Sequence, residues 1–414
     1  MNDIFDKCRT DEGYFGGFRA RGDTYFTQPV LDGAPGPRMR FRGKDVIVWA
    51  INNYLGIAGM PELQAAAAEA LARHGPSAPM GSRMLTGNSE EHIELERRFA
   101  AFSGKQAAIV FNYGYLGVLG TISALVGRDD IVLIDSLSHA SMIDAVVLAS
   151  AGRRFHPFKH NDMEDLERHL VSAGRDRKGG ILVVTEGVFG MKGNTARLAE
   201  ICGLKEKYGA RLFVDDAHGF GIMGEHGRGT GEYLGVQDRI DLYFGTFAKA
   251  FAAIGGVTAG DKDVVEWVRY NARSNVFAKA LPLVYVKTVE AALSIVENTP
   301  RLRERMWHIT RLLQSGLTEL GYDIGGTESP ITPVYVISGD EKTAMEMISM
   351  LREDYGIFVS GVSFPVVPRG VILFRMIPTA AHTEEDVEKT VNAFRCMRDR
   401  MKLDLSSKPS RQNR

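Results

Sequence analysis

Short apolar runs alternate with helical patterns through the first two-thirds of the chain, and this alternation limits the folds available to it. The strand-like runs are AAIVF (107–111), IVLID (131–135), ILVVTEG (181–187), RLFVDDA (211–217) and DLYFGT (241–246). Helical patterns lie between them, for example at 115–127, 162–170 and 198–209. Near-continuous apolar strands separated by helices indicate a parallel sheet with both faces covered. The sequence therefore predicts an α/β fold with a mostly parallel central sheet.

The pattern changes near residue 285, which predicts a second domain. A long helical stretch reaches Leu320, and the strand-like segments TPVYVI, GIFVSG and GVILFRMI follow around one helical segment. A chain of 414 residues also exceeds the usual size of a single core. We predict an irregular N-terminal arm at 1–45, a large domain at 46–284, a smaller C-terminal α+β domain at 285–405 and a disordered tail at 406–414.

Charge and cysteine content exclude several classes of protein. The formal net charge of −1 gives no electrostatic reason to expect nucleic acid or an anionic membrane as partner. No two of the three cysteines share metal-ligand spacing, so no metal site is predicted, and their scarcity suits a reducing, cytoplasmic location. The N-terminus is polar and charged, unlike a secretory signal, and no apolar run reaches the ~18 residues of a membrane span.

Lys249 follows an apolar strand in the small-residue segment GTFAKAFAAIGG (245–256). Taken alone, such a lysine is more often a solvated loop charge. However, an amine that attacks an aldehyde must be held at the carboxyl end of a parallel strand, where ligand sites of α/β sheets lie. Thr246, three residues earlier, could donate its hydroxyl to a phosphate.

Two acids end another buried strand, in VDDAHGFG (214–221). Adjacent buried acids are costly unless a ligand needs them, and a pyridine ring nitrogen needs one carboxylate to stay protonated. Asp215 is the candidate for this role, and His218 could then bind the ring's phenolate oxygen. The alternative is an ordinary Asx-type turn.

The same region contains Gly219-Phe-Gly-Ile-Met-Gly224, which formally matches the dinucleotide fingerprint GxGxxG. EHGRGTGEYLG follows it, rather than the amphipathic helix that a bound pyrophosphate needs. We therefore do not interpret it as a nucleotide site.

Three further residue groups could complete a ligand site. In FNYGY (111–115) a strand runs into a helix, so the amides of Gly114 and Tyr115 could hold a phosphate. His139, in IDSLSHASMID, could stack on a flat heteroaromatic ring. Arg375, in FRMIPTAAHT, could bind an amino-acid carboxylate with two hydrogen bonds. Taken singly, these residues are more often a turn glycine, a helix cap and a paired or exposed arginine.

Together the motifs resemble the α-oxoamine synthases, a branch of the fold-type I pyridoxal-phosphate (PLP) enzymes. The resemblance covers roughly residues 40–400, with seven motifs in order: NNYLG, FNYGY, SHASMID, VTEGVFGMKG, VDDAHGFG, GTFAKAFAAIGG and PTAAHT. Within the family, GTFAK, IGGVTAG, NARSNVFAKAL, TESPITPVYV and PMGSRMLTGNSEEHIELE are most similar to bacterial serine palmitoyltransferases.

The resemblance implies a role for each matching residue. Lys249 matches the Schiff-base lysine, Asp215 the pyridinium partner, His218 the phenolate partner and His139 the ring-stacking histidine. Gly114, Tyr115 and Thr246 match phosphate contacts, and Asn52 and Arg375 match positions that hold the substrate carboxylate. The family is homodimeric, with the active site at the subunit interface.

Three positions depart from the family pattern. Gly190 and Ala248 stand where many members have serine, and Pro282 stands where a threonine from the neighbouring subunit often touches the phosphate. Each departure removes a potential hydrogen bond, but none removes an essential chemical group.

The implied reaction is a decarboxylative Claisen condensation of an amino acid with an acyl thioester. L-serine with palmitoyl-CoA would give 3-ketosphinganine, the first sphingolipid intermediate, and the lipid product could bring peripheral contact with a membrane.

Glycine, alanine or cysteate as the amino acid would indicate another member of the family, such as 8-amino-7-oxononanoate synthase or 2-amino-3-ketobutyrate CoA ligase, and acyl carrier protein could replace CoA. An aminotransferase or aldolase is a second alternative. A non-catalytic partner subunit is a third, against which Lys249 argues.

Overall fold

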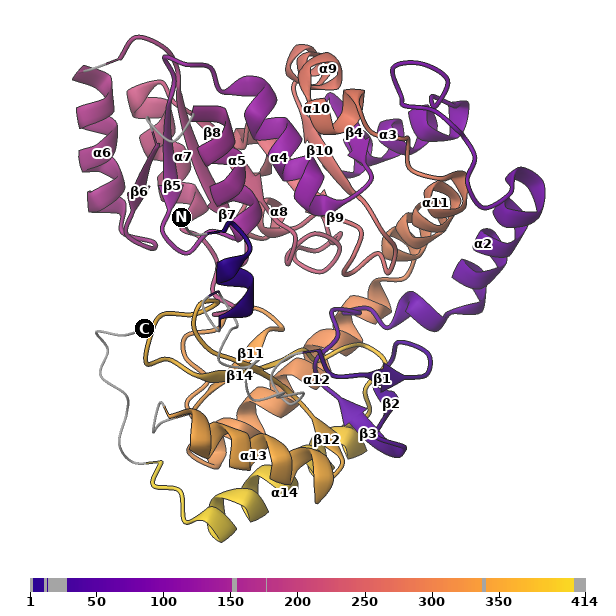
Figure 1. The fold of residues 1–414 in the computed structure, drawn as a ribbon, viewed down its shortest axis with the longest axis vertical. Coiled ribbons are helices and arrows are strands. Elements are labelled where there is room, and N and C mark those ends of the chain that lie inside the picture. The colour runs from indigo at the N-terminus through magenta and orange to yellow at the C-terminus, as the bar shows by residue number, and fades with distance from the viewer. Residues whose placement is uncertain are drawn as a thin grey trace. The chain divides into compact units, whose positions relative to one another are not determined.

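The computed structural model describes residues 3–10, 13, 28–150, 155–175, 177–336 and 340–405, which fall into two compact units (Figure 1). The sheet unit comprises the described residues of 52–190 and 194–303. The terminal unit comprises those of 1–51, 191–193 and 304–414. Each unit has its own sheet and its own buried core.

A seven-stranded sheet forms the centre of the sheet unit, with the described strands in the order β4-β10-β9-β8-β7-β5-β6. All the strands run parallel except β10, which is antiparallel to both of its neighbours. The predicted mostly parallel sheet is therefore confirmed. The strands are β4 (Ala107–Phe111), β5 (Ile131–Asp135), β6 (Phe155–Phe158), β7 (Ile181–Glu186), β8 (Arg211–Asp215), β9 (Leu242–Thr246) and β10 (Gly256–Gly260).

Helices connect these strands and bury apolar side chains against the sheet (Figure 1). Val118 and Ile122, for example, pack in one cluster with Val184 and Phe213 of the strands. The helices are η2 (Ile57–Gly59), α2 (Pro61–His74), α3 (Glu90–Phe102), α4 (Gly114–Leu125), α5 (Ala140–Ser150), α6 (Met163–Arg175), α7 (Leu198–Tyr208), α8 (Thr230–Tyr233), η3 (Gln237–Arg239), α9 (Lys262–Asn271), α10 (Arg273–Val276) and α11 (Leu283–Asn298).

Two smaller sheets lie in the terminal unit, one ordered β1-β2-β3-β12 and the other β11-β14-β13. The elements are η1 (Asp6–Arg9), β1 (Leu31–Asp32), β2 (Arg38–Phe41), β3 (Lys44–Val48), most of α12 (Pro300–Glu319), β11 (Thr332–Tyr335), α13 (Glu341–Glu353), β12 (Ile357–Phe358), β13 (Ser360–Val362), β14 (Leu373–Met376) and α14 (Glu384–Met401). This mixture of helices and strands confirms the predicted α+β character.

The boundaries of the units differ from the predicted ones at two places. Three short strands lie between residues 31 and 48, where an irregular arm was predicted up to residue 45, and β3 pairs in parallel with β12, far along the chain. Arg38 and Arg40 on the exposed side of β2 obscured its short apolar alternation. The large unit also extends to residue 303, because α11 packs against α2 and α3. The predicted tail at 406–414 lies outside the described residues.

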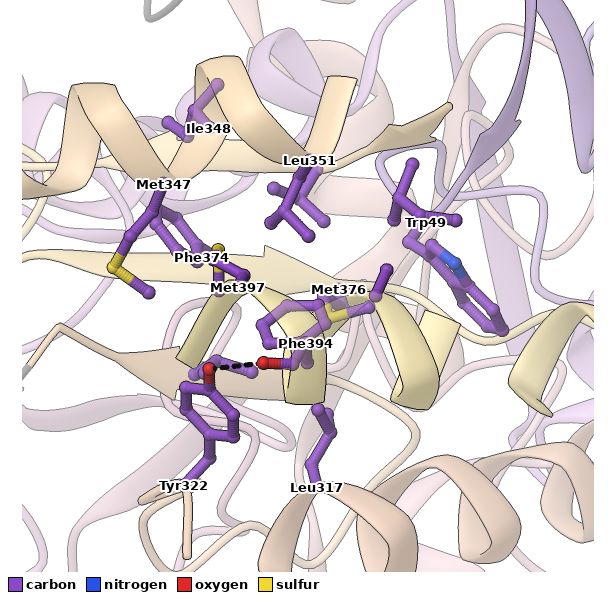
Figure 2. Close-up of a cluster of buried hydrophobic side chains, with 14 of the residues drawn as sticks. Trp49, Leu317, Tyr322, Met347, Ile348, Leu351, Phe374, Met376, Phe394 and Met397 are labelled. Carbon is purple, nitrogen blue, oxygen red and sulfur yellow. Dashed lines mark hydrogen bonds between the residues drawn. The ribbon is translucent and has the colours of Figure 1, made fainter. Parts of the chain in front are cut away.

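The core of the terminal unit gathers aromatic, aliphatic and methionine side chains from both ends of the chain (Figure 2). Trp49, next to β3, and Phe394 of α14 are both fully buried in it. The hydroxyl of Tyr322 donates to the carbonyl of Phe394 at 2.9 Å, so the one polar atom of this side chain is satisfied. None of the described helices is long and apolar enough to cross a membrane.

His382, in the PTAAHT motif, has a structural role in this unit. Its ring stacks on Trp49 with centroids 3.9 Å apart. Nε2 donates to the carbonyl of Val48 at 3.1 Å, while Nδ1 accepts the N–H of Thr379 at 3.1 Å and also lies 2.8 Å from its hydroxyl. Both ring nitrogens of the neutral imidazole are thus used, and burial lowers the pKa of His382 to about 4.

The buried neutral His382 predicts a loss of stability in mild acid. The unfolded histidine takes up a proton near pH 6.5 and the folded one only near pH 4, so the free energy of unfolding falls as pH drops between these values. The loss should reach about 3 kcal/mol. Thermal unfolding of a His382→Gln variant should show a flatter pH dependence in this window. An unchanged slope in His382→Gln would contradict the assignment.

Candidate active site

Four neighbouring parallel strands each end in a polar residue at the same edge of the sheet. Asp135, Glu186, Asp215 and Thr246 are the last residues of β5, β7, β8 and β9. In the parallel register Glu186 is paired with Asp215, so both side chains emerge on one face. The carboxyl edge of a parallel sheet is where α/β proteins bind ligands.

Lys249 lies in a tight turn three residues after β9. Phe247 and Phe251 flank it, are fully buried, and pack on Phe99 with ring centroids 4.8 and 5.5 Å away. The N–H of Ala252 closes the turn by donating to the carbonyl of Lys249 at 3.0 Å. The backbone of the lysine is therefore held on both sides by core packing.

Asp215 is buried within electrostatic reach of Lys249. Its side chain is 5% exposed, and one oxygen accepts the N–H of Ala217 at 3.0 Å. Burial raises the pKa of Asp215, while the charges of Lys249 and His139 oppose this rise. An acid buried next to a cation matches the partner that a pyridinium nitrogen requires.

Asp216, the second acid of the pair, has a structural role. Its carboxylate accepts the N–H and the hydroxyl of Thr230, each at 2.6 Å, and the hydroxyl of Tyr243. Burial nevertheless raises the pKa of Asp216 to about 6. Asp216 thereby holds the turns at 217–229, after which comes only the four-residue helix α8. The GxGxxG match thus lacks the long helix that a dinucleotide site needs, in agreement with the prediction.

His218 is buried and held by a tyrosine. The hydroxyl of Tyr54, in the NNYLG motif, lies 2.8 Å from Nδ1 of His218. When this hydroxyl donates, the ring proton resides on Nε2. A Cβ atom built on Gly190 would lie 2.7 Å from that Nε2, so the glycine leaves room for the imidazole. Gly190 stands where many family members have serine, and here the His218 ring lies close to the Gly190 backbone.

His139 follows β5 and caps the start of α5. Its Nδ1 lies 2.8 Å from the hydroxyl of Ser141, and its backbone N–H donates to Glu186 at 2.8 Å. Burial lowers the pKa of His139; Asp215 opposes this shift and Lys249 adds to it. These mutual electrostatic effects show that Lys249, Asp215 and His139 lie close together, as the sequence predicts.

Glu186 is the member of this cluster that sequence reasoning missed. It is 6% exposed, and its oxygens accept the N–H groups of His139 and Gly190. Burial and the neighbouring Asp215 raise the pKa of Glu186 to about 8. The signal was present, because ILVVTEG ends a buried strand in an acid just as RLFVDDA does.

Gly114 and Tyr115 occupy the first two positions of α4, where helix N–H groups have no acceptor inside the helix. A Cβ on Gly114 would lie 2.8 Å from the hydroxyl of Thr246, so this helix start adjoins the end of β9. The Thr246 hydroxyl donates to Gly255 at 3.1 Å, and the exposed Ala248 donates its N–H to that hydroxyl at 3.3 Å. The three predicted phosphate contacts are therefore neighbours.

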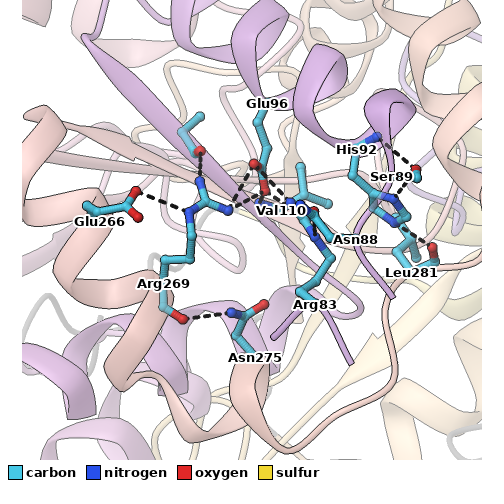
Figure 3. Close-up of polar contacts among 11 residues, drawn as sticks. Arg83, Asn88, Ser89, His92, Glu96, Val110, Glu266, Arg269, Asn275 and Leu281 are labelled. Carbon is cyan, nitrogen blue, oxygen red and sulfur yellow. Dashed lines mark hydrogen bonds and ion pairs between the residues drawn. The ribbon is translucent and has the colours of Figure 1, made fainter. Parts of the chain in front are cut away.

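A buried ionic network fixes the strand that leads to Gly114 (Figure 3). Glu96 of α3 pairs with Arg83 at 2.9 Å and with Arg269 of α9 at 3.0 Å. It also accepts the N–H of Val110 at 3.0 Å, and Arg269 donates to the carbonyl of Ala108 at 3.3 Å. β4 is an edge strand, so these contacts satisfy backbone groups on its unpaired side.

Asn52 and Arg375, the predicted carboxylate ligands, belong to different compact units. Asn52 is partly exposed near the start of the sheet unit. Arg375 lies in β14 of the terminal unit and is 9% exposed. In the sheet it stands opposite Pro333 of β11 and Ser360 of β13. Pro282, the third departure from the family pattern, caps α11. The joint role of Asn52 and Arg375 stays a prediction.

A cavity of about 1110 Å³ lies at the opposite, amino-terminal edge of the sheet. Several of its charged lining residues pair with one another: Lys205 and Arg211 both bind Asp241, at 2.6 and 2.7 Å. It is lined by none of Lys249, Asp215, Glu186 and His139, which we call the Lys249 cluster. The volume of this cavity is therefore no reason to place the reaction there.

The donor set of the Lys249 cluster fits PLP. It offers an amine for the aldehyde, a buried carboxylate for the ring nitrogen, and helix N–H groups with a hydroxyl for the phosphate. His139 and His218 supply imidazoles beside these groups.

Comparisons with known proteins agree with this reading. The model of the aminotransferase class I and II family matches residues 44–394. The cysteate-C-fatty acyltransferase of Capnocytophaga ochracea is 45% identical over 404 residues, which cover 97% of this chain and 96% of that protein. The serine palmitoyltransferase of Bacteriovorax stolpii is 39% identical over 372 residues, covering 90% and 87%. A solved structure of serine palmitoyltransferase (SPT) with PLP superposes on this chain with a TM-score of 0.90 at 32% identity. The match covers 97% of this chain and 100% of that one.

The chain belongs to the aminotransferase class I and II family, and within it to the α-oxoamine synthases. Its fold is that of the fold-type I PLP-dependent transferases. The predicted family, fold class and cofactor are thus confirmed at this level. The relatives carry different substrate names, so the choice of amino acid is a separate question.

Replacing Arg83 by Ala should destabilise the protein, because it leaves Glu96 buried with less compensation. The side chains of Arg83 and Glu96 are only 6% and 7% exposed. We expect a loss of roughly 2–4 kcal/mol in the free energy of unfolding, measured by denaturant titration. Arg97→Ala on α3, the helix that carries Glu96, is the control, since its pair with Glu94 is exposed and should contribute little to stability. Equal losses would contradict the role of the network.

Replacing Tyr54 by Phe should weaken PLP binding, because the imidazole of His218 loses the group that orients it. The loss of one net hydrogen bond corresponds to about 1 kcal/mol of stability and about a fivefold rise in the dissociation constant of PLP. Tyr322→Phe in the terminal unit is the matched control, since it also removes one buried, hydrogen-bonded hydroxyl. It should cost similar stability without changing PLP affinity. Unchanged affinity in Tyr54→Phe would contradict the orienting role.

Proposed function

We propose that this chain joins an amino acid to a long-chain acyl thioester by decarboxylative Claisen condensation. The observation that supports this most is the cluster of Lys249, Asp215, Glu186 and His139 at the carboxyl edge of the sheet. The new C–C bond forms between the α-carbon and the acyl carbon. Carbon dioxide and the free thiol leave, and reprotonation of the α-carbon gives an α-amino ketone.

Lys249 carries the cofactor and moves the α-proton of the amino acid with its amine. Asp215 keeps the ring nitrogen protonated, and His218 hydrogen-bonds the phenolate oxygen. When bound, PLP supplies an electron sink for the pair left when a bond to the α-carbon breaks. Gly114 and Tyr115 would hold the phosphate through their amides, and the Thr246 hydroxyl would donate to it in place of the Gly255 carbonyl.

His139 covers the face of the ring and orients the amino acid. Asn52 and Arg375 would hold the substrate carboxylate and so orient the amino acid for the reaction. These roles complete the assignment of the predicted site residues. Homodimer formation, with both chains contributing to the site, and a cytoplasmic location are part of the same proposal.

Two amino acids are the leading candidates as substrate. L-Serine with palmitoyl-CoA is the pair favoured by the sequence motifs, and its product is 3-ketosphinganine. L-Cysteate is the second candidate, because the relative that is 45% identical is named a cysteate-C-fatty acyltransferase. Cysteate would give a sulfonated α-amino ketone instead. Both reactions use the same residues and release the same thiol.

A thiol-release assay tests the reaction class and the substrate together. The wild-type protein should release CoA with one of L-serine, L-cysteate, glycine or L-alanine across a ladder of acyl-CoAs, and product mass identifies the ketone. Lys249→Ala should lose on the order of 10³-fold in turnover, since the proton carrier is gone. Lys262→Ala, an exposed lysine at the start of α9, is the control and should retain activity.

Two results would contradict the proposal. One is amino-group transfer to a keto acid without thiol release, which would indicate an aminotransferase. The other is wild-type turnover by Lys249→Ala.

A further inference from the structure

Glu186 binds two separate backbone segments with one side chain. Oε1 accepts the N–H of His139 at 2.8 Å, in the segment that follows β5. Oε2 accepts the N–H of Gly190 at 3.2 Å, in the segment that follows β7. The side chain is 6% exposed, so water competes little for these bonds.

The first of these segments sets the ring of His139. The carbonyl of His139 accepts the N–H of Met142 at 2.9 Å, so His139 forms the start of α5. Its Nδ1 also accepts the N–H of Ser141 at 3.2 Å. With the backbone held by Glu186 and the ring held by Ser141, the imidazole has little freedom to rotate.

The second segment sets the place of His218. A Cβ on Gly190 would lie only 2.7 Å from Nε2 of His218, so the Gly190 backbone borders the ring on that side. Tyr54 binds the ring's other nitrogen at 2.8 Å. A shift of the Gly190 segment would therefore open or crowd one side of the imidazole.

We propose that Glu186 is a positioning residue that aligns His139 and His218 by holding the backbone at His139 and Gly190. The proposal rests on the proposed function for the effect on turnover, but not for the alignment itself. A carboxyl group can accept an N–H at each of its oxygens in either protonation state. An amide cannot, because it has one acceptor oxygen and its nitrogen only donates. Glu186→Gln therefore keeps one bond and sets an N–H against an N–H at the other.

The test uses histidine resonances of the PLP-free protein, which do not depend on catalysis. The protein is labelled at histidine ¹³Cε1, and His139→Gln and His218→Gln variants assign the two signals among the ten histidines. In Glu186→Gln we expect shifted signals and altered titration midpoints for His139 and His218, with the other histidines unchanged. Glu186→Asp keeps two acceptors on a shorter side chain and should restore the wild-type signals in part.

Asp241→Asn is the matched control. This carboxylate also accepts a backbone N–H, from Leu212 at 2.8 Å, but at the opposite edge of the same sheet. It should lower stability without moving either histidine signal. Unchanged His139 and His218 signals in Glu186→Gln, or equal shifts in Asp241→Asn, would overturn the proposal.

Kinetics of the PLP-loaded protein provide the second readout. Misplaced catalytic groups should lower the turnover number of Glu186→Gln by roughly 10- to 100-fold, with a smaller effect on the KM of the amino acid. Histidine shifts combined with wild-type turnover would overturn the positioning role. An absence of thiol release in the wild-type protein would instead refute the proposed function and leave the NMR result to decide the alignment.

Discussion

The arrangement of the site depends on the burial of two carboxyl groups beside one lysine. Placing an ionised carboxylate in the interior costs several kcal/mol unless opposite charge and hydrogen bonds compensate. Asp215 and Glu186 face this cost together, at the ends of adjacent strands. Burial raises the pKa of both groups; the charge of Lys249 opposes this rise, and three backbone N–H groups bind their oxygens. A bound pyridinium ring would add a second positive charge beside these acids.

The fold supplies this compensation through its topology. Parallel strands end at one edge, so residues distant in the sequence meet there without long loops. Aromatic packing around Phe247 and Phe251 fixes the turn that carries Lys249, and the Glu96 network fixes the strand that leads to α4. The proposed catalytic groups are thus held by well-packed surroundings, which is what precise positioning requires.

The parallel sheet could be predicted from the sequence, because buried strands leave a strong local pattern. The polar ends of these strands led to Lys249, Asp215 and the two histidines as candidate site residues, and their roles stay predictions. The sequence did not yield Glu186, whose importance arises from hydrogen bonds to two distant backbone segments. It also failed at β2, where arginines mask a short alternation, and at the start of β3, whose partner β12 lies far along the chain. His382 shows the reverse case, since a family motif proves to be a buried structural contact. Such non-local partners cannot be read from neighbouring residues.

The most direct test of the account is to locate the covalent link between cofactor and protein. Borohydride reduction of the PLP-loaded protein makes this link permanent, and proteolysis with mass spectrometry identifies the modified residue. The account predicts the phosphopyridoxyl mass on the peptide that contains Lys249, and none on that peptide in Lys249→Ala. Modification of a different lysine, or a wild-type protein that binds PLP without any reducible link, would contradict it.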